Sequence, residues 1–286
     1  MTVFDAVIQG IIQGLTEFLP ISSDGHLSIY QHFTDNYGES ALIFTLMLHL
    51  GTLIAVFITY RQTILELISE AFSILYDLFH GRLFKFRPND TRKMIYMLIV
   101  TTLPLFGFVL IKDFITSFAE DSDIIVEGIC FLFTAIMLFL AAKCVKGRKT
   151  ARQMTVKDAL IIGIFQGLAI LPGVSRSGST ISSGLLMGYD KNYMVTYSFI
   201  LSIPAILGAC VLDIPEILAA GMVYSWPVII AGLVSSTLVG FVAIKVLKYL
   251  VVNDKFIIFS YYTFILGTAV FLIGLAERFM GFTFVI

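Results

Sequence analysis

A segment near the start of this sequence is repeated, with substitutions, about half-way along it. Residues 5–25 (DAVIQGIIQGLTEFLPISSDG) align without a gap to residues 158–178 (DALIIGIFQGLAILPGVSRSG), and ten of the twenty-one letters are identical at a constant offset of 153. Among the differences, the first copy has Glu17, Ser23 and His26 where the second has Ile170, Arg176 and Ser179. A duplication with unequal halves is therefore indicated, one half suited to acid–base chemistry and the other to holding an anion.

The composition identifies the class of protein. Of 286 residues, 58% are hydrophobic and 14% are charged, whereas a soluble domain is about a quarter charged. We therefore expect an integral membrane protein, and the net charge of −1 predicts no nucleic-acid partner. Cys130, Cys144 and Cys210 lie in apolar runs, which favours buried thiols over a disulfide or metal framework.

Apolar stretches long enough to cross a membrane, about 20 residues, occur six times, at about 41–60, 93–112, 124–145, 193–213, 226–247 and 255–276. The apolar pieces at 3–19 and 159–172 are too short, end in clusters of Gly, Pro and Ser, and are each followed by another short apolar piece. Broken backbone at membrane depth survives where protein or water satisfies its polar groups. We therefore expect two re-entrant helical hairpins, at about 3–33 and 159–188.

Loop charges predict the orientation, because Lys and Arg favour cytoplasmic loops. Segments 80–93 and 146–157 each hold five basic residues, whereas 27–40 and 113–123 hold acidic residues and no Lys or Arg. Three spans separate the hairpins, so the second repeat (146–286) is expected to be inverted relative to the first (1–145) within one membrane domain. The predicted fold class is all-α, with six transmembrane helices and two hairpins whose tips meet near the midplane, a plan found in transporters.

An amphipathic helix at the membrane interface is expected at 61–80, where four charged residues interrupt an apolar stretch.

The first hairpin concentrates polar side chains at its turn. Gln13 and Glu17 are four residues apart and share a helix face, and Pro20 precedes a tip of Ser22, Ser23, Asp24, Gly25 and His26. Ionisable groups inside a membrane are costly and indicate function. The alternative is that Glu17 and His26 satisfy each other and the backbone of the turn.

The second hairpin has a turn rich in Gly and Ser that carries one cation, Arg176. Small residues let backbone N–H groups approach a ligand, and a guanidinium suits phosphate. We expect an oxyanion site here, in preference to an Arg176 that merely extends to the interface. His49, inside the expected span 41–60, is interpreted as a hydrogen-bonded structural histidine in preference to a residue that lines the site.

The segments QGLTEFLPISSDGH and PGVSRSGST resemble the two signature motifs of the bacterial undecaprenyl-diphosphate phosphatase family, also called bacitracin-resistance proteins. The resemblance implies hydrolysis of undecaprenyl diphosphate to the monophosphate carrier used for peptidoglycan, and resistance to bacitracin. It implies a multi-pass protein of the bacterial cytoplasmic (inner) membrane. From the orientation of the first hairpin, we expect the active site to face the outer, periplasmic side. Expected partners are the polyprenyl diphosphate substrate, membrane lipids and, as a candidate, a second copy in a homodimer.

The resemblance also assigns roles to residues. Glu17 would be the acid/base, Ser23 the nucleophile, His26 an acid/base or alternative nucleophile, and Arg176 the diphosphate clamp; direct attack by water stays open. The substrate-binding residues would be Gln13, Ser22, Gly25, Gly173, Ser175, Ser177, Gly178 and Thr180.

Two positions depart from the family pattern. Gln13 stands where many relatives have a second glutamate, and Asp24 stands where Thr or Ser is expected. Glu17 and Asp24 could hold a divalent cation, Mg²⁺ or Ca²⁺, although Asp24 could instead cap the helix that follows.

The rival interpretation is a transporter or flippase of an anionic or lipid-phosphate substrate, since inverted repeats with broken helices are typical of transporters. Transport does not require a Ser, His and Glu set on one hairpin tip, so these residues favour the phosphatase.

Overall fold

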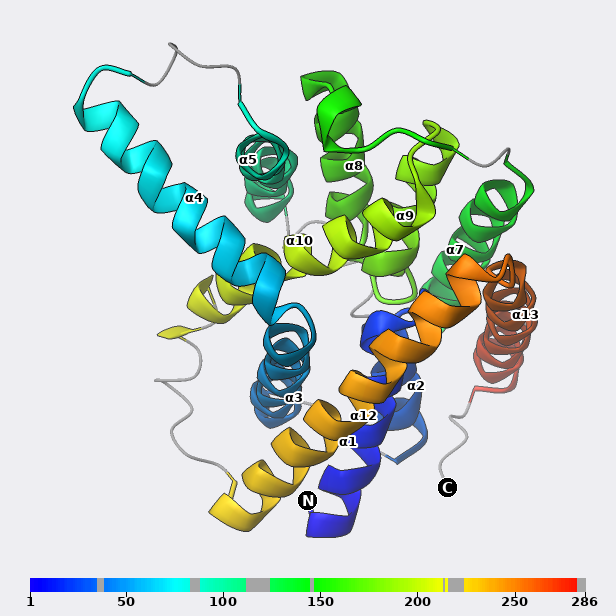
Figure 1. Ribbon diagram of the computed structural model, residues 1–286. Coiled ribbons are helices and arrows are strands. Elements are labelled where there is room, and N and C mark those ends of the chain that lie inside the picture. The colour runs from blue at the N-terminus through cyan, green and yellow to red at the C-terminus, as the bar shows by residue number, and fades with distance from the viewer. Residues whose placement is uncertain are drawn as a thin grey trace.

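The computed structural model describes residues 1–34, 39–82, 88–111, 124–144, 147–212, 214–215 and 224–281, with the backbone alone at 39–42. Within these residues the chain forms helices and turns and contains no β-strand (Figure 1). The first half contributes α1 (Val3–Phe18), α2 (Ser23–Thr34), α3 (Glu39–Thr59), α4 (Arg61–Phe79), α5 (Asp90–Leu110) and α7 (Ile125–Lys143). The second half contributes the 3₁₀ turn η1 (Ala151–Gln153), α8 (Val156–Leu168), α9 (Arg176–Leu186), α10 (Lys191–Leu212), α12 (Trp226–Val252) and α13 (Ile257–Met280).

Each of the six expected spans coincides with a helix. Among the described residues, five helices are long and apolar enough to cross a membrane: α5, α7, α10, α12 and α13. The remaining one, α3, is a candidate span through its residues Ile43–Thr59 taken together with α4, which follows after a bend of 85°. The prediction of an all-helical, multi-pass membrane protein is confirmed. The outer loop predicted at 113–123 lies outside the described residues, as do parts of the other predicted loops.

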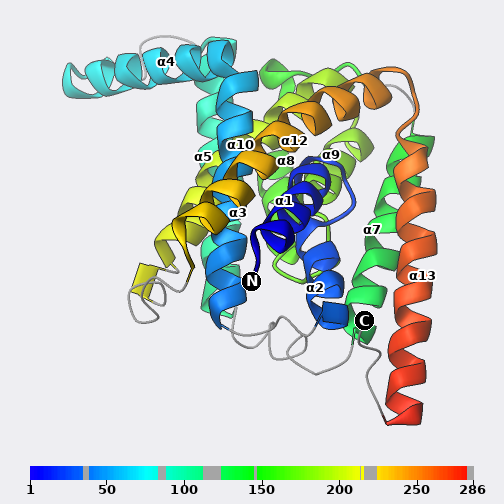
Figure 2. The same ribbon diagram turned by 90° about the horizontal axis from the view of Figure 1, so that it is seen from below.

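The helix expected at 61–80 is α4, and it projects sideways from the end of α3 (Figure 2). Arg92 of α5 holds its polar face: the guanidinium donates to Glu70 at 2.5 Å, to Asp77 at 2.8 Å and to Ser73 at 2.9 Å. The bend is therefore fixed by ionic contacts between α4 and α5. The opposite face leaves large apolar side chains exposed, among them Phe72 and Phe79.

The repeated sequence produces repeated helix starts. Thr2 and Thr155 are the N-caps of α1 and α8, and each forms a reciprocal capping box with the aspartate three residues later, Asp5 or Asp158. Such a box satisfies backbone N–H groups that a helix start leaves unpaired. The Thr-x-x-Asp signal was present in the sequence, and it explains why both copies share an aspartate.

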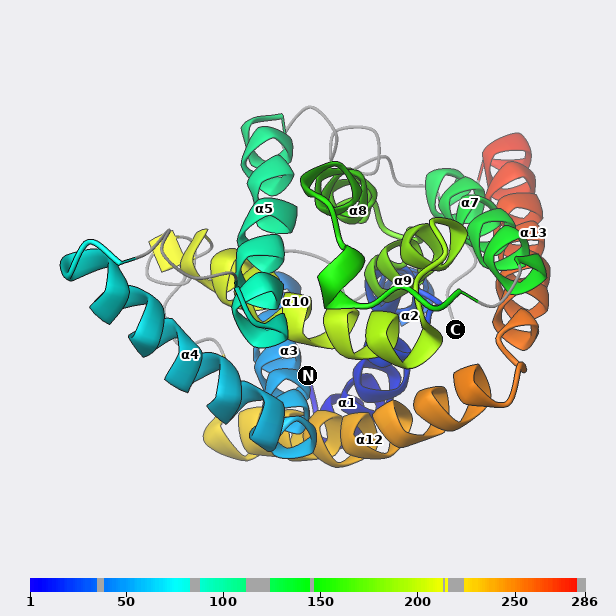
Figure 3. The same ribbon diagram turned by 45° about the horizontal axis from the view of Figure 1, so that its top comes forward.

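Each hairpin packs on a long helix from the other half of the chain. Helix α1 lies along α12, and α8 lies along α5 (Figures 1 and 3). Small residues set these crossings, because a Cβ added at Gly10 or Gly14 would lie within 3 Å of α12, and one added at Gly163 or Gly167 would lie as close to α5. Glycines four residues apart let membrane helices approach closely. The two halves are therefore interlocked.

The second helix of the second hairpin, α9, lies deep in the molecule. Helix α9 packs against α7, α8 and α10. Its nine residues from Ser177 to Leu185 are buried, and seven of them are Ser, Thr or Gly. Helices α7 and α13 lie side by side next to it (Figures 2 and 3). The turns of both hairpins consequently meet inside the molecule, and the polar residues of the two repeats come together there.

Candidate active site

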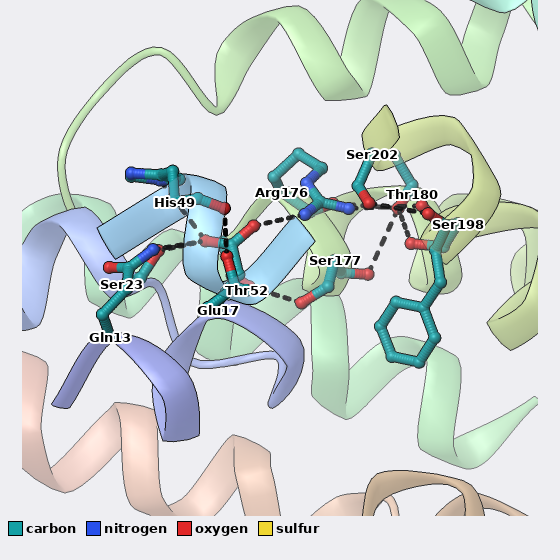
Figure 4. A network of polar contacts seen from close by, with 12 residues as sticks. Gln13, Glu17, Ser23, His49, Thr52, Arg176, Ser177, Thr180, Ser198 and Ser202 are labelled. Carbon is teal, nitrogen blue, oxygen red and sulfur yellow. Dashed lines mark hydrogen bonds and ion pairs between the residues drawn. The ribbon is translucent and has the colours of Figure 1, made fainter. Parts of the chain in front are cut away.

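Glu17, in the last turn of α1, is the centre of a buried polar network (Figure 4). Its Oε1 accepts a hydrogen bond from Arg176 Nη2 at 2.5 Å. Its Oε2 accepts from Ser23 Oγ at 2.7 Å and from Gln13 Nε2 at 3.2 Å. Gln13 and Glu17 share a helix face, as their spacing predicts. One carboxylate therefore joins a hydroxyl, an amide and a guanidinium.

Ser23 is the first residue of α2, directly after the turn that ends α1. The preceding Ser22 has a backbone φ of 70°, in the left-handed region that residues other than glycine rarely adopt. Its hydroxyl accepts from the backbone N–H of Gly25 at 3.3 Å and of Gly173 at 3.1 Å. Ser22 thus fixes the turn and ties it to the second hairpin, while Ser23 faces Glu17.

The two turns approach each other through glycines. A Cβ on Gly25 would lie 2.7 Å from the backbone nitrogen of Gly173, and a Cβ on Gly178 would lie 3.3 Å from the carbonyl oxygen of Pro20. These contacts correspond, since Gly25 and Gly178, and likewise Pro20 and Gly173, are separated by the repeat offset of 153. The expected substrate-binding glycines therefore set the distance between the hairpins.

Arg176 begins α9 and reaches across to the first hairpin. Its Nη1 donates to the carbonyl oxygen of Ser198 in α10 at 3.2 Å. The hydroxyls of Thr180 and Ser198 are 2.7 Å apart behind it, and Thr180 also donates to the Arg176 carbonyl at 2.9 Å. The guanidinium is thereby held between two helices.

The serine hydroxyls of the second turn form hydrogen bonds with other groups of the protein. Ser175 is the N-cap of α9 and accepts from Gly178 N–H at 3.0 Å. Its hydroxyl lies 3.3 Å from that of Ser177, and Ser177 donates to the Leu19 carbonyl at 3.3 Å. These serines hold the turn against the first hairpin, one layer behind Arg176.

His26 lies on a different side of α2 from Ser23. Its Nδ1 is 2.6 Å from the Ser22 carbonyl oxygen and its Nε2 is 2.7 Å from the Tyr262 hydroxyl of α13. A carbonyl can only accept, so Nδ1 carries a proton, and in the neutral ring Nε2 accepts from Tyr262. Both ring nitrogens are therefore occupied, and the structure does not bring His26 to Glu17 and Ser23.

The histidine beside Glu17 is His49 of α3, with Nε2 3.5 Å from Glu17 Oε2 and 3.6 Å from Asp24 Oδ1. Sequence reasoning favoured a structural role for His49. The signal that could have placed it here was an ionisable side chain inside an otherwise apolar span. Asp24 is the most exposed member of the group, with 49% of its side chain accessible.

The arrangement can carry out attack by a hydroxyl on an anionic centre. A serine hydroxyl that donates to a carboxylate can lose its proton as it attacks, and a guanidinium beside it can stabilise negative charge on phosphate oxygens.

Comparison with protein-family models identifies the family of this chain. Residues 6–269 match the model of the bacitracin resistance protein BacA. The chain belongs to the BacA family.

BacA-family relatives align over almost the whole chain. An undecaprenyl-diphosphatase of Alkaliphilus metalliredigens is 41% identical over 278 residues, which are 96% of this chain and 100% of that protein. Proteins of the same name from Methanosphaera stadtmanae and Carboxydothermus hydrogenoformans are 37% and 36% identical, over 93% and 98% of this chain and 96% and 100% of those proteins.

Glu17 and Asp24, the two carboxylates predicted to hold a divalent cation, both lie beside His49 Nε2 in this BacA-family chain. Among the described residues, no group of three or more His, Cys, Asp or Glu side chains is arranged to hold a metal ion. Both Glu17 oxygens already accept hydrogen bonds, and His49 Nε2 lies within 3.6 Å of both carboxylates. In the described residues the two carboxylates share His49 as a neighbour, and the divalent cation stays a prediction.

Proposed function

We propose that this protein hydrolyses undecaprenyl diphosphate to undecaprenyl phosphate and inorganic phosphate, and so contributes to bacitracin resistance. The observation that carries the proposal is the hydrogen bond of 2.7 Å from Ser23 to Glu17, whose other oxygen is held by Arg176. The names of the relatives aligned above support the same reaction.

In the proposed reaction, Ser23 Oγ attacks the terminal phosphorus and its proton passes to Glu17. The bond from phosphorus to the bridging oxygen breaks, and undecaprenyl phosphate leaves. Water then hydrolyses the phosphoserine, and Ser23 regains its proton. Arg176 has five N–H donors, of which those not used by Glu17 and Ser198 are available to phosphate oxygens.

We assign His26 a supporting role in this scheme, because Ser22 and Tyr262 occupy both of its ring nitrogens. It would anchor α2 to α13. Ser22, Gly25, Gly173, Ser175, Ser177 and Gly178 would set the geometry of the turns, and Gln13 and Thr180 would hold Glu17 and Arg176 in place.

The membrane arrangement that fits this function is the inverted repeat, with α1–α2 and α8–α9 as re-entrant hairpins that enter from opposite faces. The basic segments near Arg92 and Arg152 would face the cytoplasm, and the first hairpin would open to the outer side of the bacterial inner membrane. The exchange of α1 and α8 between the halves supports this arrangement.

Phosphate release from a polyprenyl diphosphate by the purified protein tests the proposal. We expect release by the native protein and its loss in Ser23→Ala, Glu17→Gln and Arg176→Gln, each checked for folding by thermal unfolding in detergent. Release that persists in all three folded variants would refute the assignment. Transfer of lipid across liposomes without phosphate release would favour the flippase.

A further inference from the structure

His49 is a titratable side chain that adjoins Glu17 and has no part in the reaction proposed above. It projects from α3 beside Glu17, as Figure 4 shows, while Asp24 approaches the same ring nitrogen from α2. The separations of 3.5 Å and 3.6 Å place Nε2 nearly equally close to both carboxylates.

The other ring nitrogen fixes the tautomer. Nδ1 lies 2.9 Å from the carbonyl oxygen of Thr45. Because a carbonyl only accepts, Nδ1 bears a proton. A neutral ring would then turn the Nε2 lone pair toward two carboxylates, which is repulsive. A proton on Nε2 converts the same geometry into two attractive contacts, so the arrangement suits an imidazolium.

The charges around Nε2 come from three neighbouring elements: Glu17 of α1, Asp24 of α2 and Arg176 of α9. With His49 protonated, two cations face two carboxylates. A protonated imidazole in this position can donate its proton to a leaving oxygen as negative charge develops there, which is what a general acid does.

The exposed fractions of these four side chains indicate the side from which a substrate would reach His49. The side chains of Glu17 and Arg176 are 6% and 15% exposed, that of His49 is 18% exposed, and that of Asp24 is 49% exposed. The network therefore opens past His49 toward Asp24. A diphosphate that approaches Ser23 from this side would place its bridging oxygen, or the water that replaces it, beside His49.

We infer that His49 is the catalytic acid and base for the leaving group and the water, and that Asp24 is a positioning residue that keeps the proton on His49. This inference rests on the proposed phosphatase function. His49 Nε2–H donates its proton to the bridging oxygen as the phosphorus–oxygen bond breaks. Neutral His49 then takes a proton from the water whose oxygen bonds to phosphorus, and Glu17 returns its proton to Ser23 as the phosphoserine bond breaks.

The test is the pH dependence of kcat and KM for farnesyl diphosphate in the native protein, His49→Gln, Asp24→Asn and the control His80→Gln. His80 lies exposed at the end of α4, where it contacts the Tyr76 carbonyl, so His80→Gln makes the same chemical change away from the site. General acid–base catalysis contributes about 10²–10⁴-fold. We expect His49→Gln to lower kcat by about 10²-fold or more, to change KM little, and to remove the alkaline fall in rate.

The Asp24→Asn variant tests whether Asp24 stabilises the proton on His49 or has only a structural role. Loss of this carboxylate removes an attraction on the imidazolium, so the alkaline fall should remain and move to lower pH. A His49→Gln protein with kcat within about fivefold of native and an unchanged pH profile would overturn the inference. If His49→Gln does not fold, an alkaline fall that Asp24→Asn leaves unmoved would overturn it. Absence of phosphate release by the native protein would instead refute the proposed function.

Discussion

Arg176 Nη2 and Glu17 Oε1 are 2.5 Å apart, and this contact joins the two repeats at residues 159 positions apart in the chain. Both side chains are largely buried. Removing one partner of a buried pair leaves an uncompensated charge and costs about 3–5 kcal/mol, whereas removing both is much less costly.

We therefore expect Glu17→Gln and Arg176→Gln each to lower the thermal unfolding midpoint more than the double variant does. Thermal unfolding of all four proteins in the same detergent measures this coupling as a double-mutant cycle. If the double variant loses the sum of the two single losses, the two side chains do not act as a pair.

Replacing Ser23 should mainly lower the activity, whereas replacing the adjacent Ser22 should mainly lower the stability. Ser23→Ala removes the hydroxyl that donates to Glu17 and should lower phosphate release by about 10³-fold or more, with the unfolding midpoint close to native. Ser22→Ala leaves two buried N–H groups, those of Gly25 and Gly173, without their acceptor. It should destabilise the protein by about 2 kcal/mol or more and retain measurable turnover. The opposite pattern would make Ser22 the nucleophile.

The glycine contact between the turns predicts a steric effect. A Cβ on Gly25 would lie 2.6 Å from the Phe131 ring and 2.7 Å from Gly173 N, so Gly25→Ala must push the hairpins apart. Overpacking of this kind costs about 1–3 kcal/mol, and the separation of Ser23 from Arg176 should abolish most of the activity.

Gly107→Ala is the matched control, because Gly107 lies in α5 and has nothing within 4 Å of an added Cβ. It should leave phosphate release unchanged and stabilise the helix by about 1 kcal/mol or less. Equal losses in Gly25→Ala and Gly107→Ala would contradict the steric explanation.

The inverted repeat can be tested at two equivalent positions. Val3 and Val156 begin α1 and α8, are separated by the repeat offset of 153, and are 47% and 55% exposed. In a background in which Cys130, Cys144 and Cys210 are replaced, Val3→Cys and Val156→Cys should react with an impermeant maleimide from opposite sides of the membrane. Labelling of both from the same side would exclude the inversion.

The local features of the fold could be read from the sequence, whereas the partners of individual side chains could not. The breaks after Phe18 and Leu168 follow from Pro, Gly and Ser next to short apolar runs, and the shared face of Gln13 and Glu17 follows from helix periodicity. The direction of His26 depends on Tyr262, which lies 236 residues away. The position of His49 depends on how α3 packs, which span lengths and loop charges do not specify. The exchange of α1 and α8 between the halves was likewise not evident from either copy alone.

The exchange between halves also imposes an order on biogenesis. Helix α1 is synthesised more than 200 residues before its packing partner α12. Until those later segments are made, Glu17 lacks Arg176, and Gly10 and Gly14 lack the helix on which they pack. The packing of the first hairpin can therefore be completed only after the chain has been made as far as α12.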